Sequence, residues 1–73
     1  MKEIFPNITV DKKIEFGKPV IVGTRVPVAV VIGHIAAGET IKDVAKEYGL
    51  TKKQVLAALK YAAKVVSEET IMA

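Results

Sequence analysis

The chain of 73 residues contains no cysteine and only one histidine. The absence of cysteine excludes disulfide bonds and thiolate metal sites, and it is typical of proteins from a reducing cytoplasm. His34 has no second histidine or cysteine with which to share a metal ion, so the sequence predicts no metal site. No cofactor is expected either.

Long apolar runs are also missing. No uninterrupted apolar stretch approaches the roughly 20 residues that a membrane-spanning helix needs. Acidic, proline and asparagine residues interrupt residues 1–10, where a signal peptide would be apolar. These absences predict a soluble cytoplasmic protein without membrane contact.

Aromatic residues make up only 5% of the chain, so the hydrophobic core has to be built from Val, Ile, Ala and Leu. Apolar residues nonetheless reach 51%, which is more than a single small domain can bury. Such a surplus usually marks an interaction surface, and we therefore expect a homodimer or a tight protein partner. Arginine is scarce as well: ten of the eleven basic residues are lysine, a composition that leans towards a thermophile.

Motifs of catalysis and nucleotide binding are absent. Neither G-x-x-x-x-G-K-[ST] nor G-x-G-x-x-G occurs, and no serine or threonine has a base within reach by sequence spacing. Glu68 and Glu69 are neighbours near the end of the chain and cannot converge on a substrate as a general acid and base would. The sequence predicts that the chain is not an enzyme.

The periodicity of the chain predicts one mainly α domain with a short N-terminal β-ribbon. β-branched runs at 8–10, 14–16 and 20–22 predict two or three strands, the first two joined as a hairpin. Helical spacing and start and stop signals predict helices at 27–37, 41–48 and 52–67. We divide the single domain, 1–73, into ribbon and loop at 1–26, a three-helix bundle at 27–67 and a tail at 68–73.

The second and third expected helices form a helix-turn-helix at 40–60, since they are joined by a tight turn around Gly49. The pattern common to such motifs requires small or apolar residues at fixed places, and this sequence supplies Val44, Ala45, Gly49, Leu50, Val55 and Ala58. Together with the first helix, they predict a three-helix bundle that contains a helix-turn-helix.

The third helix carries four lysines and no acidic residue between 51 and 66. Lys53, Lys60 and Lys64 lie within about 40° of one another around the helix axis, and Lys52 and Gln54 flank them. In a recognition helix these five residues would contact phosphates and base edges of double-stranded DNA. The alternative is an ordinary solvated face. Three features speak against DNA: no arginine or aromatic platform on this helix, and an acidic neighbouring helix with Glu39, Asp43 and Glu47.

A second apolar strip on the third helix and the loop before the first helix are candidates for partner binding. The strip consists of Ala58, Tyr61, Ala62 and Val65, and it is either a docking face or part of a wider core. Lys18 and Arg25 lie in the loop at 17–27. Arg25 could instead have a structural role, by capping carbonyl groups or pairing with Glu15 or Glu39.

The residues from 8 to 63 resemble the proteins catalogued as domain of unknown function 433. The resemblance rests on G-K-P-V-I-V-G-T-R-V-P-V at 17–28, A-A-G-E-T-I-K-D-V-A-K-E-Y at 36–48, L-T at 50–51 and V-L-A-A-L-K-Y-A-A at 55–63. It implies a homeodomain-like fold with an N-terminal ribbon and an antitoxin that neutralises a PIN-like ribonuclease toxin, with repression of its own operon as a further implied activity. Phe16 departs from the family, which usually has a second glycine before Gly17.

Two functions follow as hypotheses. The first is an antitoxin-like, dimeric DNA-binding adaptor that uses the lysines on DNA and the apolar strip for self-association. The alternative is a protein-interaction module without DNA binding, in which the ribbon and the loop at 17–27 dock to the partner.

Overall fold

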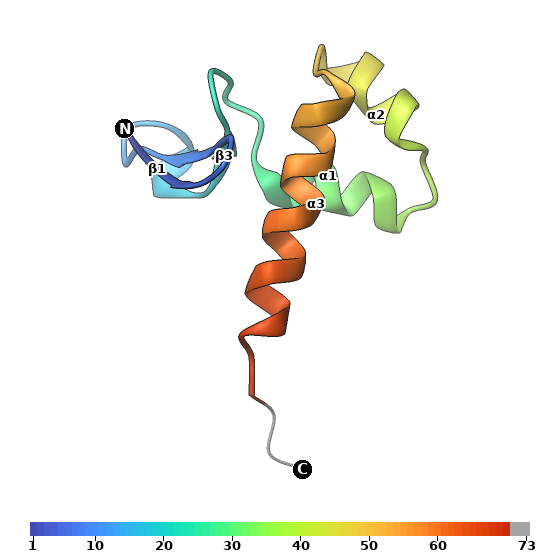
Figure 1. The fold of residues 1–73 in the computed structure, drawn as a ribbon. Helices are drawn as coiled ribbons and strands as arrows, with labels where there is room; N and C mark the ends of the chain where they lie inside the picture. Colours follow the sequence, from blue (N-terminus) through green and yellow to red (C-terminus); the bar gives the residue numbers. More distant parts are fainter. Residues whose placement is uncertain (71–73) are drawn as a thin grey trace.

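The computed structural model of the protein describes residues 1–70, which form a small antiparallel sheet followed by three helices (Figure 1). The mainly α fold with an N-terminal β-ribbon is therefore confirmed. The elements are β1 Lys2–Phe5, β2 Ile8–Val10, the short 3-10 turn η1 Glu15–Gly17, β3 Val20–Ile21, α1 Val28–Ala36, α2 Ile41–Tyr48 and α3 Lys52–Ser67. None of the helices in this part of the chain is long and apolar enough to cross a membrane.

The sheet has the order β1-β2-β3, with both pairs antiparallel. The expected hairpin between 8–10 and 14–16 is wrong, because the chain turns at Asp11 instead of continuing as a strand. The Asp11 side chain accepts a hydrogen bond from the Lys13 N–H at 2.9 Å, and the backbone carbonyl of Asp11 accepts one from the Ile14 N–H at 2.8 Å. Glu15 and Phe16 then follow with φ angles of 49° and 57°, which no regular strand allows.

β2 pairs with β3 on one edge and with β1 on the other. Periodicity does not predict β1. Its residues are mostly exposed, so they lack the alternation of buried and exposed positions that marks a strand. The signal that could have revealed it is Pro6-Asn7, since asparagine tolerates the left-handed region and Asn7 has φ 68°.

The helix boundaries follow local capping chemistry. The Thr40 hydroxyl accepts a hydrogen bond from the Asp43 N–H, which fixes the start of α2. A reciprocal capping box between Thr51 and Gln54 does the same for α3. Between them Gly49 adopts the left-handed conformation, with φ 66°, that lets α2 end and the chain reverse into α3.

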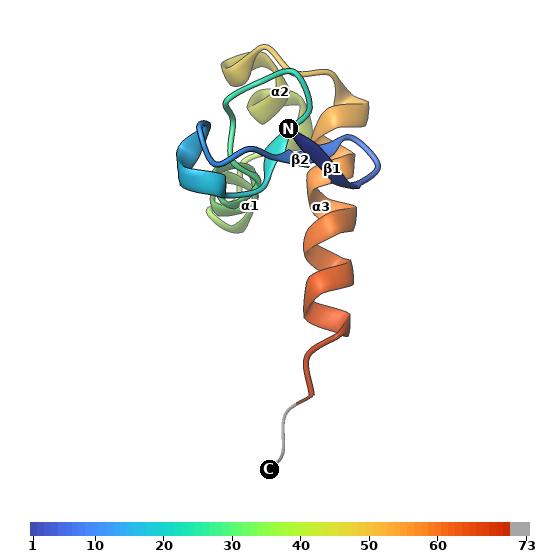
Figure 2. The same ribbon diagram turned by 90° about the vertical axis from the view of Figure 1, so that its left-hand side faces the viewer.

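The core lies where β2, β3 and the three helices meet, and its buried hydrophobic side chains are all aliphatic. They are Ile8, Val20, Ile21, Val28, Val31, Val44, Leu50, Val55, Ala57 and Ala58. Helical spacing predicts a buried arc on α3 made of Val55, Leu56, Leu59, Ala62, Ala63 and Val66. This prediction is partly wrong: Ala63 is exposed and Val66 is 66% exposed, because the sheet packs beside α3 and turns Ala57 and Ala58 inward. The C-terminal half of α3 extends beyond the rest of the domain (Figures 1 and 2).

Candidate interaction surfaces

Three of the lysines predicted to bind nucleic acid lie together at the N-terminal half of α3. Lys52, Lys53 and Lys60 are exposed and line one shallow groove. The opposite wall of the groove is the β1–β2 turn, with Phe5, Pro6 and Asn7. The groove lies at a helix N-terminus, where backbone N–H groups add to the positive potential of the lysines. The arrangement can attract an anion.

The other two predicted nucleic-acid contacts are engaged within the chain. Lys64 Nζ lies 2.8 Å from a carboxylate oxygen of Glu68, one turn later, and this hydrogen bond raises the pKa of Lys64. Gln54 Oε1 accepts a hydrogen bond from the Thr51 N–H at 2.8 Å as part of the capping box. A base or phosphate contact from either residue would compete with these interactions.

Sequence reasoning overlooked Lys42 on α2. Lys42 lines a second shallow groove together with Lys52, so the basic surface continues from α3 onto α2. At about 100° per residue, Lys42 and Glu47 lie about 140° apart around the axis of α2. The flank of α2 that carries Lys42 therefore lies beside the N-terminus of α3, and the flank that carries Glu47 faces α1.

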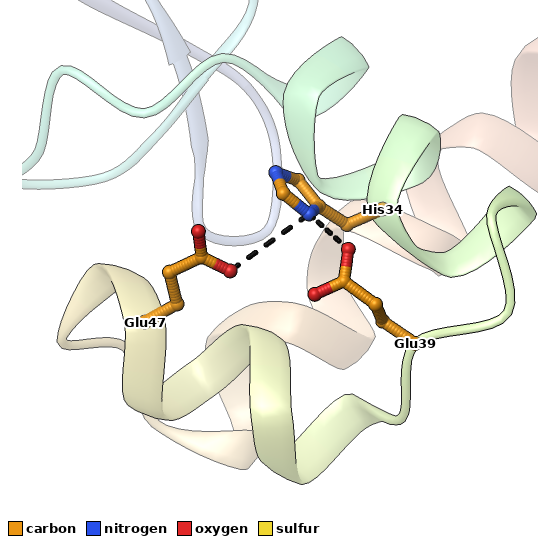
Figure 3. Close-up of side chains that lie close together, drawn as sticks. All are labelled: His34, Glu39 and Glu47. Atoms are coloured by element: carbon orange, nitrogen blue, oxygen red, sulfur yellow. Dashed lines mark hydrogen bonds and ion pairs between the residues drawn. The ribbon is translucent and has the colours of Figure 1, made fainter.

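Of the three acidic residues expected beside the third helix, Asp43 is exposed in the first turn of α2, whereas Glu39 and Glu47 turn toward α1. Carboxylate oxygens of Glu39 and Glu47 approach Nδ1 of His34, on α1 (Figure 3). Both carboxylates are thus held toward α1. The signal that could have found this arrangement is weak, because the three residues come from α1, the α1–α2 loop and the last turn of α2.

The His34 ring is held on both of its nitrogens. Nδ1 is in hydrogen-bond contact with Glu39 and lies 3.8 Å from Glu47, while Nε2 lies 2.7 Å from the Tyr48 hydroxyl oxygen. The hydrogen bond to Glu39 raises the pKa of His34; partial desolvation opposes this effect, and the negative charges of Glu39 and Glu47 add to it. In its charged form, His34 donates from Nδ1 to Glu39 and from Nε2 to Tyr48.

An apolar groove separates α1 from the C-terminal half of α3. It brings together three of the residues predicted to bind a partner, Lys18, Tyr61 and Val65. The α1 wall is made largely of small side chains, and the α3 wall includes two exposed valines, 41% for Val65 and 66% for Val66. Part of the exposed apolar surface thus lies at this groove, and the rest lies at Met1, Ile4 and Phe16.

The two remaining predicted partner residues lie elsewhere. Ala58 is fully buried in the core, so it supports the fold and cannot contact a partner; the strip it belongs to is partly core because the sheet covers that side of α3. Arg25 is exposed and lines a separate shallow pocket with Met1 and Thr9. Within residues 1–70 it makes no hydrogen bond or ion pair, and Glu39 is engaged by His34 instead.

The sequence matches a known family over most of its length. The family is described as "Protein of unknown function (DUF433)", and the match covers residues 8–62. The chain belongs to the DUF433 family. The resemblance noted at 17–28 and 36–63 is thereby confirmed.

Two curated relatives from Mycobacterium tuberculosis are similar to this DUF433 chain. A protein named "Putative antitoxin VapB45" is 42% identical over 53 residues, and "Uncharacterized protein Rv2308" is 35% identical over 60 residues. These alignments cover 73% and 82% of this chain but only 22% and 25% of the relatives. The chain thus spans about a quarter of the length of the curated relatives it matches.

A solved structure is similar as well. The crystal structure of Rv2018 from Mycobacterium tuberculosis matches with a TM-score of 0.67 and 42% sequence identity. The match covers 73% of this chain and 25% of that chain. The arrangement of ribbon and helices described above therefore also occurs as one part of a larger protein.

Proposed function

We propose that this DUF433 chain is an antitoxin-like adaptor, without enzymatic activity, that binds double-stranded DNA through its helix-turn-helix. The observation that carries the proposal is the separation of charge around that motif. Lys42, Lys52, Lys53 and Lys60 line two adjoining grooves along the first and middle turns of α3. The carboxylates of Glu39 and Glu47 turn to His34, and Asp43 remains exposed on α2. A recognition helix whose exposed start is basic is suited to phosphate contact.

The residues that carry the binding differ in part from those that periodicity singled out. Lys64 is paired with Glu68 and lies toward the far end of α3 from the helix-turn-helix turn. In helix-turn-helix proteins the N-terminal residues of the recognition helix reach the major groove. We therefore assign the phosphate contacts to Lys42, Lys52, Lys53 and Lys60, and we assign Lys64 a minor part.

The apolar groove between α1 and α3 supports the second half of the adaptor role, which is protein binding. Exposed valines on a projecting helix favour a second copy of the chain as a cover, because burial of Val65 and Val66 would remove apolar surface from water. The relative named as an antitoxin supports a toxin as the further partner, and we propose one of the PIN-like ribonuclease type in the cytoplasm.

The alternative, a protein-interaction module without DNA binding, is favoured by a different observation. Arg25 is exposed and has no internal partner among the described residues, next to the ribbon and the loop at 17–27. A guanidinium group that the fold does not use is available to a carboxylate of a partner.

Fluorescence anisotropy with a labelled duplex, measured over a series of salt concentrations, tests the DNA-binding proposal. If each lysine contacts one phosphate, replacing Lys52 and Lys53 by glutamine should lower affinity about eightfold per lysine at 0.1 M salt and reduce the salt slope by about 2. The matched control is glutamine at Lys12 and Lys13, an adjacent exposed pair in the Asp11–Ile14 turn with the same change in net charge. Equal loss in both double variants would show only non-specific attraction and would sink the proposal.

A further inference from the structure

His34, Glu39 and Glu47 converge from three parts of the chain that local sequence does not connect. The imidazole Nδ1 and one oxygen of each carboxylate all lie within 4.8 Å of one another. In Figure 3 the two glutamate side chains point from the α2 side toward the same edge of the imidazole ring. Two carboxylates and an imidazole nitrogen thus face a common point.

The charges of these groups call for a cation at that point. A proton on Nδ1 supplies one positive charge against two carboxylates, which leaves the cluster with a surplus negative charge. No lysine or arginine among residues 1–70 is ion-paired with Glu39 or Glu47 to offset it. A divalent cation bound by the neutral imidazole and both carboxylates would balance the charge fully, since two negative charges meet two positive ones.

The orientation of the ring favours coordination through Nδ1. With Nε2–H donating to the Tyr48 hydroxyl 2.7 Å away, the neutral ring has its lone pair on Nδ1, directed at the carboxylates. A partner on the second nitrogen fixes the tautomer and ring orientation of histidine ligands in metal sites. Tyr48 is therefore the positioning residue of the cluster.

We propose that His34, Glu39 and Glu47 form a binding site for one divalent transition-metal ion of the Zn²⁺ type. One imidazole and two carboxylates suit such ions better than Mg²⁺ or Ca²⁺, which prefer sites made of oxygen alone. Zn²⁺ binds nitrogen and carboxylate oxygen at about 2.0–2.2 Å, so its ligand atoms lie about 3–3.6 Å apart. The Nδ1–Glu47 separation of 3.8 Å reaches this range by a small rotation of an exposed side chain. With three protein ligands the ion keeps a position open to water.

Isothermal titration of the untagged protein with ZnCl₂, at neutral pH, tests the proposal. Because the chain has one histidine and no cysteine, an ion bound through imidazole at 1:1 stoichiometry has to use His34. Nitrogen-15 NMR of the single imidazole should show the Nδ1 resonance shifting on titration while Nε2 remains protonated. At free Zn²⁺ tenfold above Kd, linkage multiplies the folding constant by about 11, and Tm should rise by several degrees.

Glu47→Gln is the informative variant, because Glu47 is half exposed and its removal leaves the His34–Glu39 contact intact. We expect it to weaken Zn²⁺ binding roughly tenfold or more. Asp43→Asn is the matched control: it makes the same carboxylate-to-amide change one turn earlier on α2, outside the cluster. Absence of Zn²⁺ binding at sub-millimolar concentration, equal affinity in both variants, or coordination through Nε2 would each overturn the proposal.

Discussion

The replacement Gly33→Ala probes both the stability of α1 and the groove that α1 borders. Gly33 lies inside α1, where glycine costs about 1 kcal/mol relative to alanine. A methyl group built at this position meets no atom within 4 Å, so the fold itself offers no steric reason for glycine. The replacement should therefore raise the free energy of unfolding by about 1 kcal/mol, or Tm by about 4–8 °C for a domain of this size.

The assay is urea unfolding followed by far-UV circular dichroism, with Gly38→Ala as the control. Gly38 has φ 96°, so the same added methyl group is strained there and should lower stability by about 1–2 kcal/mol. A Gly33→Ala protein less stable than the wild type at low micromolar concentration would refute the reasoning, because it would mean that α1 is already closely packed at that point.

Protein concentration adds a functional readout to the same variant. Gly33 also lines the apolar groove, where we propose that a second copy packs. If the glycine allows close approach of that copy, the added methyl group stabilises the monomer but weakens the dimer. The gain in stability should then shrink as the protein concentration rises, and a gain that is independent of concentration would argue against self-association at Gly33.

Three further predictions concern single positions. Phe16→Gly should retain the fold and leave stability unchanged or raised by up to about 1 kcal/mol in urea unfolding, because Phe16 is 94% exposed and has φ 57°, a conformation that favours glycine. Val44→Ala should cost about 2–3 kcal/mol through a core cavity, whereas Val66→Ala should cost less than about 0.5 kcal/mol in the monomer; equal costs would contradict the described core. In buffer with a metal chelator, the raised pKa of His34 should make the stabilisation by its charged form full below about pH 6.5 and lost as pH rises through the folded-state pKa, so that the difference in Tm between wild type and His34→Gln is larger on the acidic side.

The helical half of the fold could be predicted from the sequence because its determinants are local. Thr40 and Thr51 cap the helices through hydrogen bonds to residues three positions later, and Gly49 provides the left-handed turn. Such signals depend on neighbours in sequence alone, which is why α2 and α3 begin and end where the residues indicate.

The ribbon was predicted less well because strands depend on partners distant in sequence. Two segments, 2–5 and 14–16, compete to pair with the strand at 8–10. The turn at Asp11 and the left-handed residues Glu15 and Phe16 prevent 14–16 from forming a strand, so β1 pairs with β2 instead. The same limit applies to the rotation of α3. Periodicity gives an apolar face wider than the core, and only contact with the sheet selects Ala57 and Ala58 over Ala63 and Val66.

The candidate sites also depend partly on local and partly on long-range structure. Helical spacing is local, so the sequence places the lysines of α3 on one face. It does not show that Lys42 and the β1–β2 turn lie beside them. The convergence of His34 with Glu39 and Glu47 depends on how α1 packs against α2, so a lone histidine in the sequence gives no sign of it.

The position of α2 links the proposed DNA-binding surface to the His34 cluster. Val44 is the only side chain of α2 that is buried, and Ile41, Ala45 and Tyr48 pack against the core with part of their surface. The His34 interactions with Tyr48 and Glu47, both on the last turn of α2, tie that turn to α1 directly before Gly49 and the start of α3. A cation at the cluster, whether a proton or a metal ion, also draws both carboxylates away from the flank that carries Lys42. The same interaction thus holds the last turn of α2 against α1 and keeps Glu39 and Glu47 turned away from the proposed DNA-binding surface, which leaves Asp43 as the exposed acidic residue of α2 nearest to Lys42.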